Sequence, residues 1–138
     1  MDQSLKKRVM VVDDDLLFLS AIKRNLELGG IEVVIFSDSR LAVDKIPEES
    51  PIDILILDLT MPEFDGAEFI EFLAMTSFTT PIIIVSGWWS ETLNLCAALG
   101  RAHGLNIVGV HEKPFDIAHV YEYLQHEQTS RFSARKLG

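Results

Sequence analysis

Short apolar runs alternate with amphipathic segments along most of the chain. Each run has the length of one β-strand and is shorter than a typical helix. Alternation of such runs with helical patterns is typical of repeated βα units, in which helices cover both faces of a parallel sheet. The pattern therefore predicts an α/β protein, (βα)5, with a doubly wound parallel five-stranded sheet. The apolar runs are 9–12, 31–36, 52–57, 81–85 and 106–110.

A helical pattern follows each apolar run. Apolar residues recur on one side of each segment at the spacing of an α-helix. The first pattern ends at Gly29 and Gly30, the residue type that best adopts a left-handed C-cap. The third begins with Asp65 and Glu68 at capping-box spacing. The five patterns comprise Phe18, Ile22 and Leu26; 39–46; 65–74; 90–103; and Ile117, Val120, Tyr121 and Leu124.

The length of 138 residues fits one domain, because cores divide only beyond roughly 250 residues. A hydrophobic fraction of 48% and a charged fraction of 24% exclude disorder as the main state. The periodicity is lost after residue 126. We therefore expect one domain over 8–126 and a C-terminal tail or linker over 127–138.

The chain is acidic, with 12 Lys and Arg against 21 Asp and Glu and a net charge of −9. This charge repels phosphate backbones and anionic lipids, so neither nucleic acid nor a membrane is an expected partner. No signal-peptide pattern is visible, and no apolar run approaches the roughly 18 residues that suggest a membrane span. The single cysteine, Cys96, cannot form an internal disulfide. We expect a cytoplasmic protein.

Polar side chains collect where the predicted strands end. Open parallel sheets bind ligands beyond the carboxyl ends of their strands, so these positions are the candidate site. They are Asp13, Asp14 and Asp15 after the first run, Asp58 after the third, Ser86 after the fourth and Lys113 soon after the fifth.

The acidic residues at the strand ends predict a cation site. If the first and third strands are neighbours, Asp13, Asp14 and Asp58 converge, and three carboxylates so close must protonate, separate or bind a cation. Mg²⁺ prefers oxygen ligands and needs only one or two carboxylates together with phosphate oxygens. The acidic cluster with a lysine therefore indicates a phosphoryl-transfer site.

Four segments carry a family resemblance: Val-Val-Asp-Asp at 11–14, Asp-Leu-Thr-Met-Pro-Glu-Phe-Asp-Gly at 58–66, Val-Ser-Gly at 85–87 and Lys-Pro-Phe at 113–115. Together and in this order they resemble the response-regulator receiver domain of two-component signal transduction. The resemblance covers about 8–124. It implies a flavodoxin-like fold with strand order 2-1-3-4-5.

The resemblance also implies residue roles. Asp58 would be the phospho-acceptor, taking a phosphoryl group from a sensor histidine kinase or a phosphotransfer protein. Asp14, Asp58 and the backbone carbonyl of Thr60 would hold Mg²⁺, with Asp13 acting through a bound water or as a further carboxylate. Ser86 would donate a hydrogen bond to a phosphoryl oxygen. Lys113, on a cis Lys113–Pro114 bond, would pair with the phosphate.

The resemblance suggests how a signal would leave the domain. The face of the fourth helix, fifth strand and fifth helix would carry it, as a possible homodimer contact or toward an output domain or effector protein. Val110 stands where many receivers have an aromatic switch residue. The segment before Lys113 is similar to receivers attached to cyclic-di-GMP phosphodiesterase outputs. Trp88 near the acceptor predicts slow self-dephosphorylation, because a large side chain excludes water.

Other function classes fit less well. A haloacid-dehalogenase-like phosphatase also uses an aspartate nucleophile, Mg²⁺ and a lysine, but it needs a second acid two residues after the nucleophile, where this chain has Thr60. A P-loop nucleotidase needs a GxxxxGK[ST] motif, which does not follow the first run. A degenerate receiver would lack one of the acceptor, metal or lysine positions, and all are filled. We therefore expect no enzyme activity beyond Mg²⁺-dependent self-phosphorylation and self-dephosphorylation.

Overall fold

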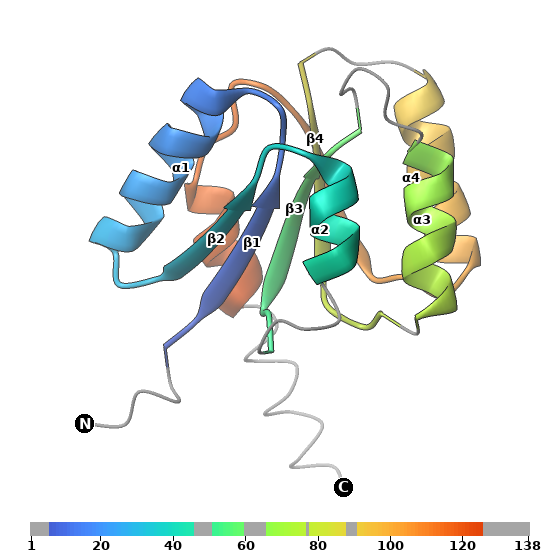
Figure 1. Ribbon diagram of the computed structural model, residues 1–138, viewed down its shortest axis with the longest axis horizontal. Coiled ribbons are helices and arrows are strands. Elements are labelled where there is room, and N and C mark those ends of the chain that lie inside the picture. Colours follow the sequence, from blue (N-terminus) through green and yellow to red (C-terminus); the bar gives the residue numbers. More distant parts are fainter. Residues whose placement is uncertain (1–5, 46–50, 60–65, 77, 88–90, 126–138) are drawn as a thin grey trace, which may run out of the picture.

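The computed structural model describes residues 6–45, 51–59, 66–76, 78–87 and 91–125. Five parallel strands form one sheet in the order β2-β1-β3-β4-β5, as predicted (Figure 1). The strands are β1 Arg8–Val12, β2 Glu32–Phe36, β3 Ile54–Asp58, β4 Ile82–Ser86 and β5 Ile107–Glu112. The sheet order confirms the flavodoxin-like (βα)5 prediction.

Helices connect the strands and cover both faces of the sheet. They are α1 Leu16–Leu28, α2 Ser39–Lys45, α3 Gly66–Met75 and α4 Glu91–Ala102. After β5, a C-terminal helix begins at residue 118 and continues to 125. Figure 1 shows α1 and the orange C-terminal helix on one side of the sheet, with α2, α3 and α4 on the other. No helix in these described ranges is long and apolar enough to cross a membrane.

The two faces of the sheet carry separate apolar cores. Side chains alternate along each strand, so Leu55 and Leu57 of β3 pack beneath α2, α3 and α4, whereas Ile54 and Ile56 pack beneath α1 and the C-terminal helix. All five residues of β3 and of β4 are buried. Burial on both faces explains why these strands are continuous apolar runs in the sequence.

Helix α1 has clear signals at both ends. Asp15 is its N-cap, with Oδ1 accepting hydrogen bonds from the backbone N–H groups of Leu17 and Phe18, each at 3.1 Å. Such a bond satisfies donors that the first helical turn leaves unpaired. Beyond the helix, Gly30 has φ +86°, a conformation that favours glycine. The predicted glycine stop is confirmed.

Several sequence predictions fall outside the described residues. These are the roles of Thr60 and Trp88, the capping position of Asp65, and the tail over 127–138. The division into a domain over 8–126 and a tail stays a prediction.

The strand register determines where the candidate site forms. Val12 pairs with Leu57, Asp58 with Val85, and Ser86 with Glu112. The last residues of β1, β3, β4 and β5 therefore lie along one edge of the sheet, together with the residues that follow them.

Candidate functional site

Three carboxylates converge at the carboxyl ends of β1 and β3. Each of Asp13, Asp14 and Asp58 offers one oxygen, and these oxygens lie within 4.8 Å of one another. The predicted convergence is confirmed, and its cause is the pairing of β1 with β3. Asp13 has no exposed surface and Asp58 is 3% exposed, whereas Asp14 is exposed. The cluster is thus buried on its inner side and open to solvent through Asp14.

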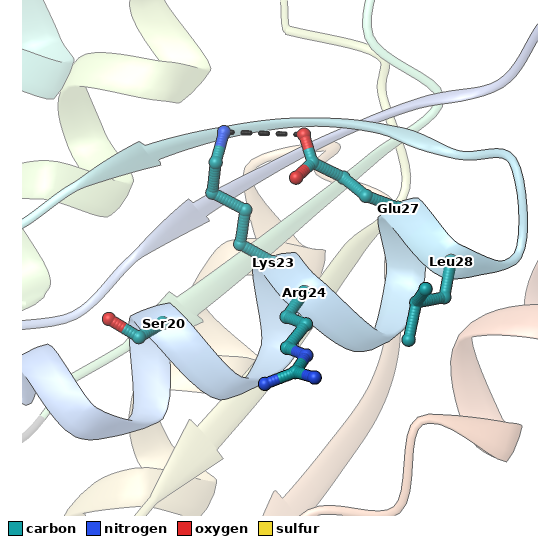
Figure 2. Close-up of a pocket in the computed structure, with 5 residues that line it drawn as sticks. All are labelled: Ser20, Lys23, Arg24, Glu27 and Leu28. Atoms are coloured by element: carbon teal, nitrogen blue, oxygen red, sulfur yellow. Dashed lines mark ion pairs between the residues drawn. The ribbon is translucent and has the colours of Figure 1, made fainter.

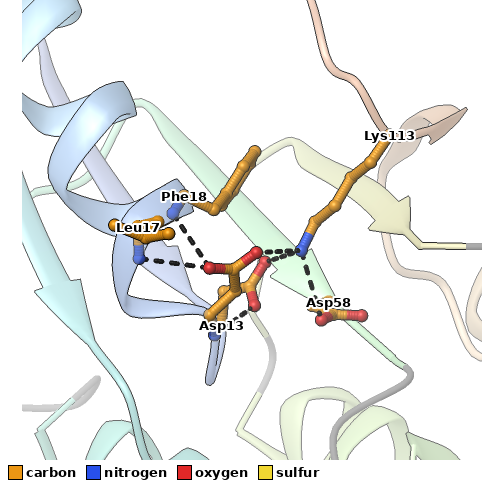
Figure 3. A network of polar contacts seen from close by, with 6 residues as sticks. Asp13, Leu17, Phe18, Asp58 and Lys113 are labelled. Carbon is orange, nitrogen blue, oxygen red and sulfur yellow. Dashed lines mark hydrogen bonds and ion pairs between the residues drawn. The ribbon is translucent and has the colours of Figure 1, made fainter.

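Lys113 places an ammonium group among these carboxylates (Figure 3). Its Nζ lies 2.7 Å from Asp13 Oδ2, 3.7 Å from Asp58 Oδ2 and 4.0 Å from Asp15 Oδ2. Lys113 therefore lies within ion-pair distance of Asp58, although its shortest ion pair is with Asp13.

The backbone on either side of Lys113 is also defined. Its N–H donates a 2.7 Å hydrogen bond to the carbonyl oxygen of Ser86, which extends the contact of β4 with β5. The Lys113–Pro114 bond is cis, as predicted. Ser86 itself is buried at the end of β4. The strand register therefore brings Ser86 and Lys113 to the edge that carries Asp58.

The close approach of buried carboxylates and an ammonium shifts the pKa values of Asp13 and Lys113. Burial raises the pKa of Asp13 to about 6, assisted by the charge of Asp58 and opposed by the Lys113 ammonium and the Asp15 N–H. Burial alone would lower the pKa of Lys113, but Asp13, Asp58 and Asp15 raise it above its ordinary value. Lys113 is therefore cationic at neutral pH.

Asp15 contributes more than the sequence reasoning assigned to it. It caps α1, its N–H donates a 2.9 Å hydrogen bond to Asp13 Oδ1, and its own carboxylate contacts Lys113. Aspartate directly before an amphipathic helix is a standard N-cap signal, so this position could have been found from the sequence.

The donor set fits a hard divalent cation. All three converging groups are carboxylates, the ligand type that Mg²⁺ takes. Asp13 Oδ2 is buried, and its contact among the described residues is the ion pair with the Lys113 ammonium at 2.7 Å. This oxygen keeps lone pairs available for a further ligand.

A separate hollow lies along the outer side of α1 (Figure 2). It has a volume of about 430 Å³ and is lined by Ser20, Lys23, Arg24, Glu27 and Leu28. All five residues come from one helix, and Lys23 forms an ion pair with Glu27 at 3.3 Å. The hollow shares no lining residue with the carboxylate site.

Comparison with known proteins identifies relatives of the chain. A family model of the response regulator receiver domain matches residues 9–125. A probable transcriptional regulatory protein of Picosynechococcus is 34% identical over 95 residues, which cover 64% of this chain and 38% of that protein. The chain thus spans little more than a third of that relative's length, and a similar share of others.

Solved structures agree with the family match. A response regulator from Colwellia psychrerythraea is 31% identical with a TM-score of 0.69, over 90% of this chain and 98% of that one. The receiver domain of an HD domain-containing protein from Pseudomonas fluorescens has a TM-score of 0.76 over 95% of this chain and 96% of that one. The identity there is 18%, so this likeness concerns the fold alone and leaves the output open.

Proposed function

Because this chain belongs to the response regulator receiver domain family, we propose that it is a phosphorylation-dependent signalling switch whose phospho-acceptor is Asp58. The observation that carries the proposal is the position of the Asp58 carboxylate. It ends a buried strand, lies 3.7 Å from the Lys113 ammonium and shares a cation-competent cluster with Asp13 and Asp14. Family membership also favours this function over a haloacid-dehalogenase-like phosphatase.

The proposed reaction is an in-line transfer from a phosphohistidine donor. An Asp58 oxygen forms a bond to phosphorus while the donor's phosphorus–nitrogen bond breaks. The donor imidazole keeps the electron pair of the broken bond and takes up a proton. No general base is needed, because Asp58 is nucleophilic as the carboxylate. The protein's contribution is therefore position and charge neutralisation.

Mg²⁺ would be held by Asp13, Asp14 and Asp58, with the Thr60 carbonyl as a further ligand. When bound, it supplies positive charge to the phosphoryl oxygens.

Lys113 supplies the second positive charge. In the resting site its ammonium is shared among three carboxylates. The phosphoryl group on Asp58 carries a charge of about −1.5 to −2 in place of the single negative charge of the carboxylate, and it draws the ammonium toward it. Ser86 donates its hydroxyl hydrogen to another phosphoryl oxygen.

The family assignment implies partners on either side of this reaction. A sensor histidine kinase or a phosphotransfer protein supplies the phosphoryl group, in the cytoplasm. An output domain or a separate effector protein reads the phosphorylated state. The proposed reading surface is formed by α4, β5 and the C-terminal helix, which is also the face proposed for a homodimer.

Labelling with radioactive acetyl phosphate and Mg²⁺ tests the acceptor. We expect Asp58→Asn to lose nearly all label, because the amide cannot form the acyl phosphate. Asp38→Asn is the matched control, since Asp38 lies just beyond β2 and pairs with Arg40 at 3.2 Å rather than with Lys113. Equal labelling of the parent and Asp58→Asn, with the label mapped to another residue, would overturn the proposal.

A further inference from the structure

The Lys113 ammonium has an aromatic neighbour as well as its acidic ones. Its Nζ lies 4.4 Å from the centroid of the Phe18 ring. Figure 3 shows this ring on the first turn of α1, turned toward the end of the lysine side chain. The Lys113 side chain is only 17% exposed. The ring therefore covers part of an ammonium that the carboxylates leave uncovered.

We propose that Phe18 is a positioning residue that holds the Lys113 ammonium at the carboxylate cluster through a cation–π contact. The inference rests on the proposed function, because it assigns Phe18 a part in the same phosphoryl transfer. The negative face of an aromatic ring attracts a cation within about 6 Å, and the attraction strengthens as the pair is shielded from water.

The ring is fixed relative to the site by two sets of contacts. The Phe18 backbone N–H donates to Asp15 Oδ1 at 3.1 Å. Its side chain is half-buried against the core beneath α1 and the C-terminal helix. Since Asp15 also contacts Lys113, one helix N-terminus presents both the ring and a carboxylate to the same ammonium.

Phe18 differs from the other partners of Lys113 because it carries no net charge. The three carboxylates compete for the ammonium, and Asp13 now holds it more closely than Asp58 does. Those ion pairs must change when Asp58 gains a phosphoryl group. The ring itself neither titrates nor accepts a phosphoryl group, so its attraction for the protonated Lys113 ammonium persists while the acidic partners of the ammonium change.

Two substitutions of Phe18 distinguish an aromatic contact with the Lys113 ammonium from mere occupation of space by an apolar side chain. Phe18→Leu keeps an apolar side chain but has no aromatic face, whereas Phe18→Tyr keeps the ring. We expect Phe18→Leu to lower the labelling rate constant at saturating acetyl phosphate by roughly two- to tenfold, and Phe18→Tyr to stay within about twofold of the parent. The matched control is Phe36→Leu, the same change against the opposite core.

A second measurement does not depend on phosphorylation. Ring currents shift lysine side-chain protons that lie over an aromatic face, so the Lys113 ε-CH₂ signal of the resting protein should be displaced upfield from those of Lys6, Lys7 and Lys23. We expect this displacement to disappear in Phe18→Leu and to persist in Phe18→Tyr and Phe36→Leu.

The two measurements distinguish failure of this inference from failure of the proposed function. An undisplaced Lys113 signal in the parent, or a folded Phe18→Leu protein that labels at the parental rate, overturns the role of Phe18. Full labelling of Asp58→Asn overturns the acceptor assignment instead, whatever Phe18 does. If Phe18→Leu does not fold, a Phe18→Tyr rate far below that of the parent also contradicts the inference.

Discussion

Asp13 brings a carboxylate with no exposed surface against the Lys113 ammonium. Removal of water from a carboxylate disfavours its charged form, and an adjacent cation favours it. At Asp13 the first effect is the larger, so its pKa rises to about 6 despite the lysine. At neutral pH the ionised Asp13 therefore lowers the stability of the folded state. This is expected for a group whose position suits cation binding.

Asp13→Asn should accordingly stabilise the fold. We expect the free energy of unfolding to rise by about 1 kcal/mol at pH 8, because the amide removes a buried charge while Asp58 and Asp15 still pair with Lys113. Denaturant titration measures this change in the free energy of unfolding. Asp44→Asn, which removes an exposed carboxylate on α2, is the control and should change little.

The stabilisation by Asp13→Asn should depend on pH. The folded-state pKa of Asp13, about 6, lies above its ordinary value of 3.8. The parent therefore recovers stability as pH falls through 6 toward 3.8 and Asp13 takes up a proton. The difference between the variant and the parent should be largest above pH 6 and much smaller near pH 4.5. A difference that is constant over this range would contradict the assigned burial effect.

At the scale of elements, the contact of β5 with the C-terminal helix depends on close packing of rings. His111 Nε2 lies 3.1 Å from the Tyr123 hydroxyl, and the His111 ring stacks on His119 with centroids 4.3 Å apart. Burial and the neighbouring His119 lower the pKa of His111. Beneath these rings lies Gly109, where an added Cβ would come 2.8 Å from Tyr123 Cζ and 3.0 Å from His111 Nε2.

Gly109→Ala should therefore loosen this strand–helix contact. We expect a loss of about 1–3 kcal/mol in unfolding free energy, because Tyr123 and His111 must move to admit the methyl group. Gly87→Ala is the control, since no atom of the described residues other than its chain neighbours lies within 4 Å of its added Cβ. Thermal or denaturant unfolding of both variants measures the difference. Equal unfolding free energies for the two variants would contradict the prediction, because the rings would then move aside without loss of stability.

Most elements could be predicted from the sequence because they follow from hydrophobic periodicity. The wholly buried strands β3 and β4 are continuous apolar runs, and Gly30 adopts the conformation that its position suggests. The convergence of Asp13 with Asp58 follows once β1 and β3 are neighbours. These features depend on local patterns and on simple rules of sheet topology.

Other features could not be predicted, because they depend on distances between elements. The stack of His111 on His119 joins a strand to a helix, and neither residue belongs to a ligand-like spacing in the sequence. The register of β4 with β5 shifts between Ile82 and Ile83. The hydrophobic pattern of the sequence does not indicate this shift. The sequence pattern places Phe18 on the core side of its helix. Only the structure shows that the Lys113 ammonium lies beside its ring.

At the scale of the whole molecule, the chain carries a net charge of −9, and three of its carboxylates converge at the site. Divalent cations are attracted to both the overall charge and the cluster. Only binding at the cluster depends on the geometry of particular residues, so substitution can separate the two contributions.

Mg²⁺ should raise the melting temperature of the parent beyond the effect of NaCl at equal ionic strength. At ten times the dissociation constant, a ligand of the folded state adds about 1.4 kcal/mol, or a few degrees for a domain of this size. Asp14→Asn should reduce the increase, because it removes the exposed ligand of the cluster. An identical increase in Asp14→Asn would assign the effect to nonspecific screening.

The charges of the site come from distant parts of the chain, with the aspartates at the ends of β1 and β3 and the lysine after β5. During synthesis on the ribosome, the aspartates emerge well before the lysine that balances them. A nascent chain that ends before Lys113 contains the aspartates but lacks the ammonium that we propose pairs with the phosphoryl group. Under the proposed function, a chain can therefore accept a phosphoryl group only after synthesis has passed β5 and reached Lys113.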